Sequence, residues 1–199
     1  MRVSRRRVVL WIGVAAACLL APAVSAQELV VTLDPVETRI EYTLGATLHT
    51  VHGSFKLKSG TIRLDLASGK VSGTVIVDST SGNSGGAGRD KRMHQEILES
   101  RKFPEIVFTP NQVKGALSPG GISQLEIAGI FQLHGQDHEL TLIMAVQPAG
   151  SQVQASTHFI VPYAEWGLKN PSVFLLRVND KVEIDVHAVG QIAPAAAQK

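Results

Sequence analysis

The sequence has almost no cysteine and few aromatic residues. Cys18 is the single cysteine among 199 residues, and aromatic residues make up 5%. Cys18 lies in an N-terminal segment that we expect to be removed, and a mature chain without cysteine has no disulfide framework and no thiol chemistry. The sequence also has no Gly-x-Ser-x-Gly elbow, His-Glu-x-x-His pair or phosphate-binding loop. These absences remove the usual sequence signatures of hydrolases, zinc proteases and nucleotide-binding enzymes.

Residues 1–26 have the pattern of an export signal. Four arginines precede an apolar run from Val8 to Ala23, and the small-residue pattern Val24-Ser25-Ala26 follows. This order is typical of a secretory signal peptide, and the apolar run is too short for a good transmembrane span. We therefore expect cleavage after Ala26 and a periplasmic or secreted protein without a transmembrane anchor. Export by the Sec pathway and by the Tat pathway both fit the signal.

The mature chain has no excess of basic residues. Four of the 19 basic residues lie in the signal and none of the 17 acidic ones do, so the net charge changes from +2 to −2 on cleavage. A basic patch is the electrostatic requirement for nucleic-acid binding, so we expect no nucleic-acid partner. We expect one domain over residues 27–190 and a flexible tail over residues 191–199.

Most of the mature chain alternates between apolar and polar residues with a period of two. Such alternation predicts strands with one buried and one solvated face. Turn signals, among them Ser59-Gly60 and Pro148-Ala149-Gly150, separate most of the segments, so we expect neighbouring strands to be antiparallel. The predicted strands cover residues 39–44, 51–58, 62–66, 71–78, 122–133, 139–146, 152–161 and 181–188.

One segment has helical spacing instead. Between Asp90 and Ser100 the apolar residues Met93, Ile97 and Leu98 share one face, which predicts one helix of about three turns with Asp90 as its N-cap. A single short helix cannot cover an open sheet. The pattern therefore predicts an all-β fold, a closed antiparallel lipocalin-like β-barrel of about eight strands with one short α-helix.

The alternation alone leaves open whether the barrel is hollow. Gly53, Gly73, Gly129 and Ala155 fall on the apolar face; small inward residues leave room, unless larger neighbours fill it. The glycine-rich stretch 79–88 next to the helix predicts a mobile loop that acts as a gate with the helix.

An ordered set of motifs resembles the YceI-like family. It includes Thr50-Val51-His52-Gly53-Ser54-Phe55, Gly88-Arg89-Asp90 with Met93-His94, Lys102-Phe103-Pro104-Glu105, Leu133-His134-Gly135 and Trp166-Gly167-Leu168. The resemblance covers about residues 33–189. It implies a periplasmic lipocalin-like barrel with a tunnel for an extended polyisoprenoid or similar amphiphile, often as a homodimer. The short charged segment Glu99–Phe103 departs from relatives that carry paired aromatics there.

The resemblance and the alternation together give the expected ligand-binding residues. Apolar side chains from the inward face and the helix should contact lipid: Tyr42, Phe55, Leu64, Val75, Met93, Leu98, Phe108, Leu125, Ile127, Phe131, Leu142, Met144 and Phe159. Three residues near the helix are candidates for a head group at the barrel mouth: Arg89, His94 and Trp166. For Trp166, a role in closing the barrel end is the alternative.

Seven histidines could indicate catalysis or metal binding, but their predicted positions give little support to either role. His52, His158 and His187 fall on the polar faces of their strands. His134 and His138 flank a turn. If the loop is Gly135-Gln136, the two histidines point to opposite faces; if it is Gly135-Gln136-Asp137, they pair directly and could share a metal. We expect no metal, no cofactor and no catalytic residue.

The function that fits these patterns is that of an exported, non-enzymatic protein that sequesters or carries a long-chain isoprenoid or similar fatty amphiphile. Two alternatives remain from the sequence. The first is an enzyme acting on an isoprenoid-type substrate in the tunnel, with His94 or His134 as base. The second is a solid-cored interaction module.

Overall fold

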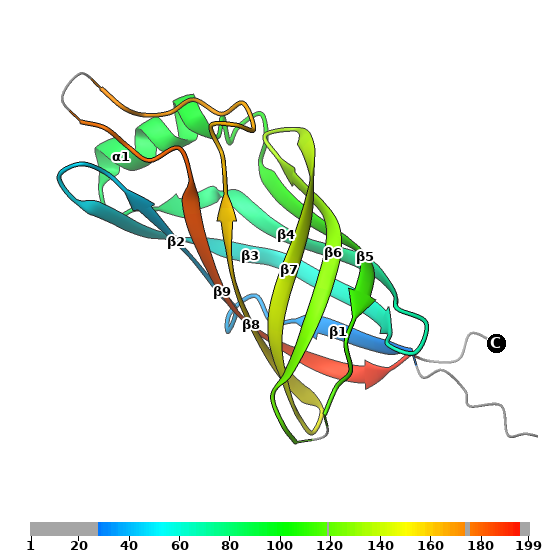
Figure 1. Ribbon diagram of the computed structural model, residues 1–199. Coiled ribbons are helices and arrows are strands. Elements are labelled where there is room, and N and C mark those ends of the chain that lie inside the picture. The colour runs from blue at the N-terminus through cyan, green and yellow to red at the C-terminus, as the bar shows by residue number, and fades with distance from the viewer. Residues whose placement is uncertain (1–27, 119, 174–175, 196–199) are drawn as a thin grey trace, which may run out of the picture.

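A computed structural model describes residues 28–118, 120–173 and 176–195. The predicted signal peptide lies outside these ranges. The elements are, in chain order, β1 (Leu29–Leu33), β2 (Arg39–Gly45), β3 (Thr50–Asp65), β4 (Lys70–Asn83), α1 (Ala87–Arg92), the π-helix η1 (Met93–Ile97), β5 (Glu105–Lys114), β6 (Ser123–Leu133), β7 (Gln136–Ala149), β8 (Gln152–Val161) and β9 (Val182–Pro194). Figure 1 shows the strands wrapped around one axis, with α1 at one end.

The sheet closes into an antiparallel barrel of eight positions, as the alternation predicts. From β2 to β9 each strand pairs with the next along the chain, and pairing of β2 with β9 completes the ring. The additional strand β1 shares one position with β2. It pairs with the far ends of the same two neighbours, as Val31 opposite Ile62 and Val31 opposite Ile192 show. A closed barrel satisfies the backbone groups that an open sheet would leave at its edges.

Strand β3 is longer than the sequence predicts. We expected a turn at Ser59-Gly60, but both residues lie inside β3, next to a register shift between Leu57 and Ser59 in its pairing with β4. A bulge of this kind bends a strand without ending it. The bend lets one strand pair with β2 through residues 50–55 and with β1 through residues 61–64.

The helical segment differs from the expected helix in its start and type. It begins after Gly86, and its second half is a π-helix, in which Leu98 N–H bonds to the carbonyl oxygen of Met93. Asp90 is not the N-cap. Its carboxylate instead accepts hydrogen bonds from the backbone N–H and the hydroxyl of Ser84, at 2.8 and 2.6 Å.

The glycine- and serine-rich stretch is not the loop we expected. Strand β4 continues through it to Asn83, and Ser79 is only 1% exposed. The Ser81 hydroxyl donates to the carbonyl oxygen of Asp78 and accepts from the N–H of Lys56 on β3. Small polar side chains can bond to nearby backbone in this way, so composition alone gave a misleading prediction of mobility.

The last strand extends to Pro194, so the domain boundary that we expected at residue 190 falls inside β9. Ile192 N–H bonds to the carbonyl oxygen of Ser151, and residues 191–194 pair with β1. Residues 196–199 lie outside the described ranges. Within the described ranges, no helix is long and apolar enough to cross a membrane.

Candidate functional site: two adjoining cavities on the barrel axis

The barrel encloses an apolar cavity of about 200 Å³, which we call the lower cavity. Every strand contributes side chains to its wall, which places it on the barrel axis. The wall includes Leu57, Leu64, Val75, Phe108, Ile127, Leu142, Met144 and Phe159. At the end remote from α1, part of this wall is one packed cluster of the buried side chains of Val71, Val113, Leu125, Val146 and Val153.

The lower cavity offers a ligand almost nothing to bond with. Thr38 and Thr157 are the polar residues of its wall. The Thr38 hydroxyl donates to the carbonyl oxygen of Val189 at 3.3 Å, and that of Thr157 donates to the carbonyl oxygen of Ile143 at 2.9 Å. A cavity with such a wall favours hydrocarbon over water, since a buried water needs two or more polar partners.

A second cavity of about 450 Å³, the upper cavity, lies beneath α1 and η1. The β2–β3 hairpin and the segment between β8 and β9 form its other sides, and Figure 1 shows both near the helix. The two cavities share four lining residues, Phe55, Ile106, Phe131 and Ile184. They are therefore adjoining parts of one interior, and these four side chains stand where the two parts meet.

The structure brings the predicted wall residues together. The lower cavity is lined by Leu64, Val75, Phe108, Leu125, Ile127, Leu142, Met144 and Phe159, the upper cavity by Tyr42, Met93 and Leu98, and both by Phe55 and Phe131. Met93 and Leu98 come from the helix, and the others from strands. The period-two alternation works here because each strand of a closed barrel turns alternate residues to its interior.

The inward glycines do not create the space. A Cβ at Gly53 would lie 2.4 Å from the ring of Tyr42, and one at Gly129 would lie 2.5 Å from the carbonyl oxygen of Thr109. One at Gly73 would lie 2.1 Å from the carbonyl oxygen of Thr61. These glycines permit close approach of neighbouring groups. Among the four small residues that we considered, Ala155 is the one that lines a cavity.

Polar groups gather on the helix side of the upper cavity. Its wall contains Ser84, Arg89, Arg92 and His49. Arg89 donates from Nε to the Ser84 hydroxyl at 3.2 Å and from Nη2 to the Ser84 carbonyl oxygen at 2.9 Å. The hydrogen bond from the Ser84 hydroxyl is the main cause that lowers the pKa of Asp90 below its usual value. Asp90 therefore stays ionised and holds the start of the helix against the end of β4.

Two of the three head-group candidates do not line either cavity. The His94 ring bonds to the Ser100 hydroxyl and to the carbonyl oxygen of Gly82, both at 2.9 Å. Trp166 stacks on His138 with ring centroids 3.9 Å apart and packs against Phe131. Arg89 does line the upper cavity. The contacts of His94 fasten the helix to β4, and those of Trp166 hold it against Phe131 and His138.

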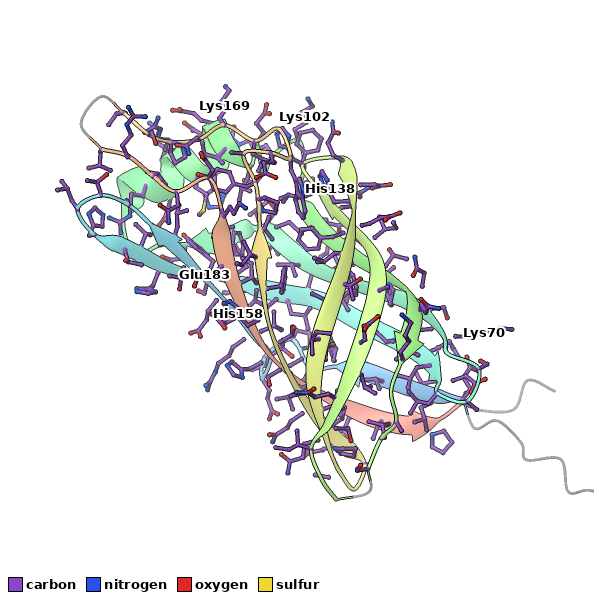
Figure 2. The ribbon with its side chains drawn as sticks, viewed as in Figure 1. Lys70, Lys102, His138, His158, Lys169 and Glu183 are labelled. Carbon is purple, nitrogen blue, oxygen red and sulfur yellow. The ribbon has the colours of Figure 1, made fainter. Side chains whose placement is uncertain are left out.

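The turn between β6 and β7 has neither form that we considered. Leu133 pairs with Gln136, so His134 and Gly135 are the two turn residues, both with positive φ. His134 Nε2 lies 2.7 Å from Glu99 Oε2, whereas His138 stacks on Trp166. The two histidines thus have separate partners. Figure 2 shows His138 at the helix end of the barrel, together with Lys102 and Lys169. Across the described ranges, no three metal-ligating side chains cluster.

Both tyrosines of the mature sequence border the upper cavity, and both have a raised pKa. Burial is the main cause for Tyr42, and the negative charge of Asp90 adds to it. Burial, with the charge of Asp180, raises the pKa of Tyr163 to about 12. Both hydroxyls therefore remain neutral over the physiological range, and they add no negative charge to the cavity.

Sequence reasoning missed several lining residues. We assigned no role to Arg92 or Tyr163 and found no partner for His49, yet all three line the upper cavity. Arg92 follows Arg89 by three positions, a spacing that puts two side chains on one helix face, so this signal was present in the sequence. Tyr163 and His49 lie outside regular elements, where no periodicity reports which way a side chain points.

Comparisons with known proteins agree with this architecture. A family model described as YceI-like domain matches residues 31–190. A search of curated proteins gives no match.

Several solved structures have the same fold. BcnA of Burkholderia cenocepacia superposes with a TM-score of 0.66 at 15% identity, covering 79% of this chain and 98% of its own. A polyisoprenoid binding domain from Saccharophagus degradans, implicated in plant cell wall breakdown, gives 0.64 at 14% identity, with 82% and 98% covered. A YceI protein from Campylobacter jejuni gives 0.60 at 16% identity, with 73% and 86% covered. At these identities the likeness is one of fold.

Proposed function

Because this chain belongs to the family of YceI-like domains, we propose that it is an exported binding protein that holds one long-chain isoprenoid or similar amphiphilic lipid in its barrel. Its action is burial of the ligand and not chemistry on it. The Saccharophagus degradans structure, which is described as a polyisoprenoid binding domain, supports this class of ligand. The export pattern of residues 1–26 supports a periplasmic or secreted location.

The observation that carries the proposal is the pair of adjoining apolar cavities. The inner part, of about 200 Å³, has no free polar group on its wall, and the outer part, of about 450 Å³, has both polar and charged residues on its wall. An apolar cavity of about 150 Å³ stays free of water, and it is already large enough to bind a small hydrocarbon. This gradient from polar to apolar matches an amphiphile inserted tail first.

The energetics favour long chains. Each buried CH₂ contributes about 0.8 kcal/mol, while association costs roughly 4–15 kcal/mol. A tail of about 15 carbons therefore gives around 12 kcal/mol before costs, whereas a tail of about 6 carbons gives roughly 5 kcal/mol. We expect affinity to rise about fourfold for each added methylene until the tail fills the cavities.

The alternatives from the sequence have less support. A solid-cored module would need a filled interior, and the barrel axis has two cavities. An enzyme with His94 or His134 as base would need that ring to face the substrate, and neither residue is among those that line a cavity. Both rings instead have partners within the fold.

Native mass spectrometry of freshly purified protein tests the proposal. We expect an added mass that organic extraction releases as a long-chain lipid, and uptake of isoprenoid by the delipidated protein. The same spectrum tests whether the protein forms the homodimer that we propose from its family. No co-purifying lipid, together with no uptake of isoprenoid or fatty acid, would overturn the binding function.

Phe131 provides a site-directed test because it stands where the two cavities meet. We expect Phe131→Asp to reduce lipid uptake at least tenfold, since a carboxylate at that position makes the path of the tail polar. The matched control is Ile130→Asp, which places the same charge on the neighbouring β6 residue outside both cavities. If folded Phe131→Asp binds as well as the parent protein, the tail does not pass this point.

A further inference from the structure

We propose that the lipid held in this barrel has an anionic head group, a carboxylate or a phosphate, and that Arg92 and Arg89 bind it at the helix side of the upper cavity. This inference rests on the proposed function, since it names the chemical class of the same ligand. It follows from how charge is distributed over the two cavity walls.

The walls of the lower and upper cavities differ in charge. The lower cavity has no charged residue on its wall. The upper cavity has two, and both are arginines; no aspartate or glutamate is among its lining residues in the described part of the chain. His49 faces the same cavity from the β2–β3 hairpin. This local positive charge runs against the mature net charge of −2, so it does not simply reflect composition.

Both guanidinium groups are anchored and retain bonding capacity. Arg92 donates from Nη1 to the carbonyl oxygen of Pro171 at 2.9 Å and from Nε to Glu96 at 3.4 Å. Arg89 uses Nε and Nη2 on Ser84. A guanidinium has five N–H groups, so hydrogens on Arg92 Nη2 and Arg89 Nη1 remain for a ligand. Anchoring lowers the entropy cost of binding because the side chains are already positioned.

The nearby carboxylates do not cancel this site. The Asp90 carboxylate interacts electrostatically with Arg89, but its hydrogen bonds come from the N–H and the hydroxyl of Ser84 and not from the guanidinium. Glu96 meets Arg92 at 3.4 Å in an exposed contact, with its side chain 55% exposed. Exposed pairs of this kind are weak. A ligand anion at this mouth competes well with such a contact, because it meets two guanidinium groups and can form charge-assisted hydrogen bonds to both.

Arg89 and Arg92 also have suitable relative positions. They are three residues apart on one helical segment, which places their side chains on one face. Two adjacent guanidinium groups match the several oxygens of a carboxylate or phosphate. A neutral hydroxyl or amide head group would leave Arg92 with only its exposed contact to Glu96 as an ion pair.

The test compares ligands that share one tail. Hexadecanoate, hexadecyl phosphate and hexadecanol are titrated into delipidated mature protein by calorimetry. We expect one or both anions to bind about tenfold or more tightly than the alcohol. A preference for phosphate over carboxylate, or the reverse, supports the proposal and identifies the head group.

Arg92→Gln is the main variant, because Arg89 also holds Ser84 in place. We expect the anion-to-alcohol ratio to fall several-fold while the affinity for hexadecanol stays within twofold, which also reports that the variant is folded. Arg63→Gln is the matched control: it removes the same charge from an exposed β3 residue outside both cavities, and the ratio should not change.

Each remaining outcome is decisive. Equal affinity for anions and alcohol, or a ratio that Arg92→Gln leaves unchanged, overturns the head-group site and leaves the lipid-binding function standing. If none of the three probes binds, and isoprenoid is not taken up either, the binding function fails and the head-group site fails with it.

Discussion

At the scale of single residues, the hydroxyl of Tyr163 links the wall of the upper cavity to the segment that precedes β9. The residue is 5% exposed, and its hydroxyl donates to the carbonyl oxygen of Asn179 at 2.5 Å. Burial raises its pKa from 10.0 to about 12. In the unfolded chain the same group loses its proton near pH 10, so between these values the unfolded state holds fewer protons.

This difference predicts that Tyr163 makes stability fall at high pH. The contribution is fully present below pH 10 and is lost as the pH rises toward about 12, with a total of up to about 2.5 kcal/mol. Tyr163→Phe should cost about 1 kcal/mol at pH 8 through the lost hydrogen bond, and its disadvantage should shrink above pH 10. Urea unfolding of both proteins from pH 8 to 11 measures this. Parallel pH curves would show that Tyr163 ionises as readily in the folded state.

Residue patterns in the sequence were sufficient to predict which side chains line the apolar wall, but not which contacts the polar side chains at the mouth make. Leu125, Ile127 and Leu142 could be assigned to the interior because alternation along a strand indicates whether each side chain points inward or outward. His94 could not be placed, since its ring turns to Ser100 and Gly82, six and twelve residues away. No local pattern encodes which of several polar partners a side chain selects.

At the scale of elements, the start of the helix depends on one carboxylate. Asp90 accepts two hydrogen bonds from Ser84, and the side-chain bond is the main cause of its lowered pKa. The stabilisation is therefore present above the usual pKa of 3.8 and is lost as the pH falls through the lowered value in the folded state. This bond connects β4 to the segment that carries Met93 and Leu98 into the upper cavity.

We expect Asp90→Asn to destabilise the protein by about 1 kcal/mol at pH 7, because charge-assisted hydrogen bonds are stronger than neutral ones. The deficit relative to the parent protein should begin to shrink as the pH drops below 3.8, and it should close once the pH is below the lowered pKa of the folded parent carboxyl. Chemical unfolding at pH 7 and near pH 3 provides the measurement. Glu41→Gln, at an exposed β2 position, is a control that should change stability little. If the deficit persists at low pH, it results from the changed shape of the side chain and not from the loss of its charge.

Element boundaries could be predicted only where local chemistry sets them. The alternation located most of the strands but not β1 or β5, and it divided β3 into two. Ser59-Gly60 looks the same in a turn and in a bulge, and only the pairing of β3 with both β1 and β2 decides between them. At the β6–β7 turn, a histidine with φ of 53° was not expected ahead of Gly135. Positive φ is uncommon outside glycine, so the sequence favoured a turn that began one residue later.

At the scale of the whole molecule, the closure of the sheet into a barrel could be predicted from the sequence, whereas the presence of cavities inside the barrel could not. Eight amphipathic strand positions with a single short helix leave few other ways to hide one apolar face. Whether the interior then fills depends on side-chain volumes summed around the barrel. The space beside the glycines that suggested a cavity is filled by close neighbours such as Tyr42 and Thr109. The cavities instead lie beside larger residues. The composition of the inward face is therefore a poor guide to the volume of the interior.

The depth of the interior gives the last prediction, which concerns tail length. Ala155 lines the lower cavity but not the upper one. Ala155→Leu adds three carbons to a space of about 200 Å³, so a tail that reaches this depth loses burial of about three carbons, or about 2 kcal/mol. A tail that ends in the upper cavity loses nothing.

The measurement compares the affinities of fatty acids from C8 to C18 for the parent protein and for Ala155→Leu. The two series should coincide for short tails and diverge for long ones, by roughly 30-fold at full length. Ala145→Leu, on β7 outside both cavities, should match the parent throughout. The filled variant should also melt no lower than the parent, because a side chain that occupies an existing cavity adds contacts without opening new space. If Ala155→Leu causes no loss of affinity at any tail length, the tail does not extend from the upper cavity into the lower one.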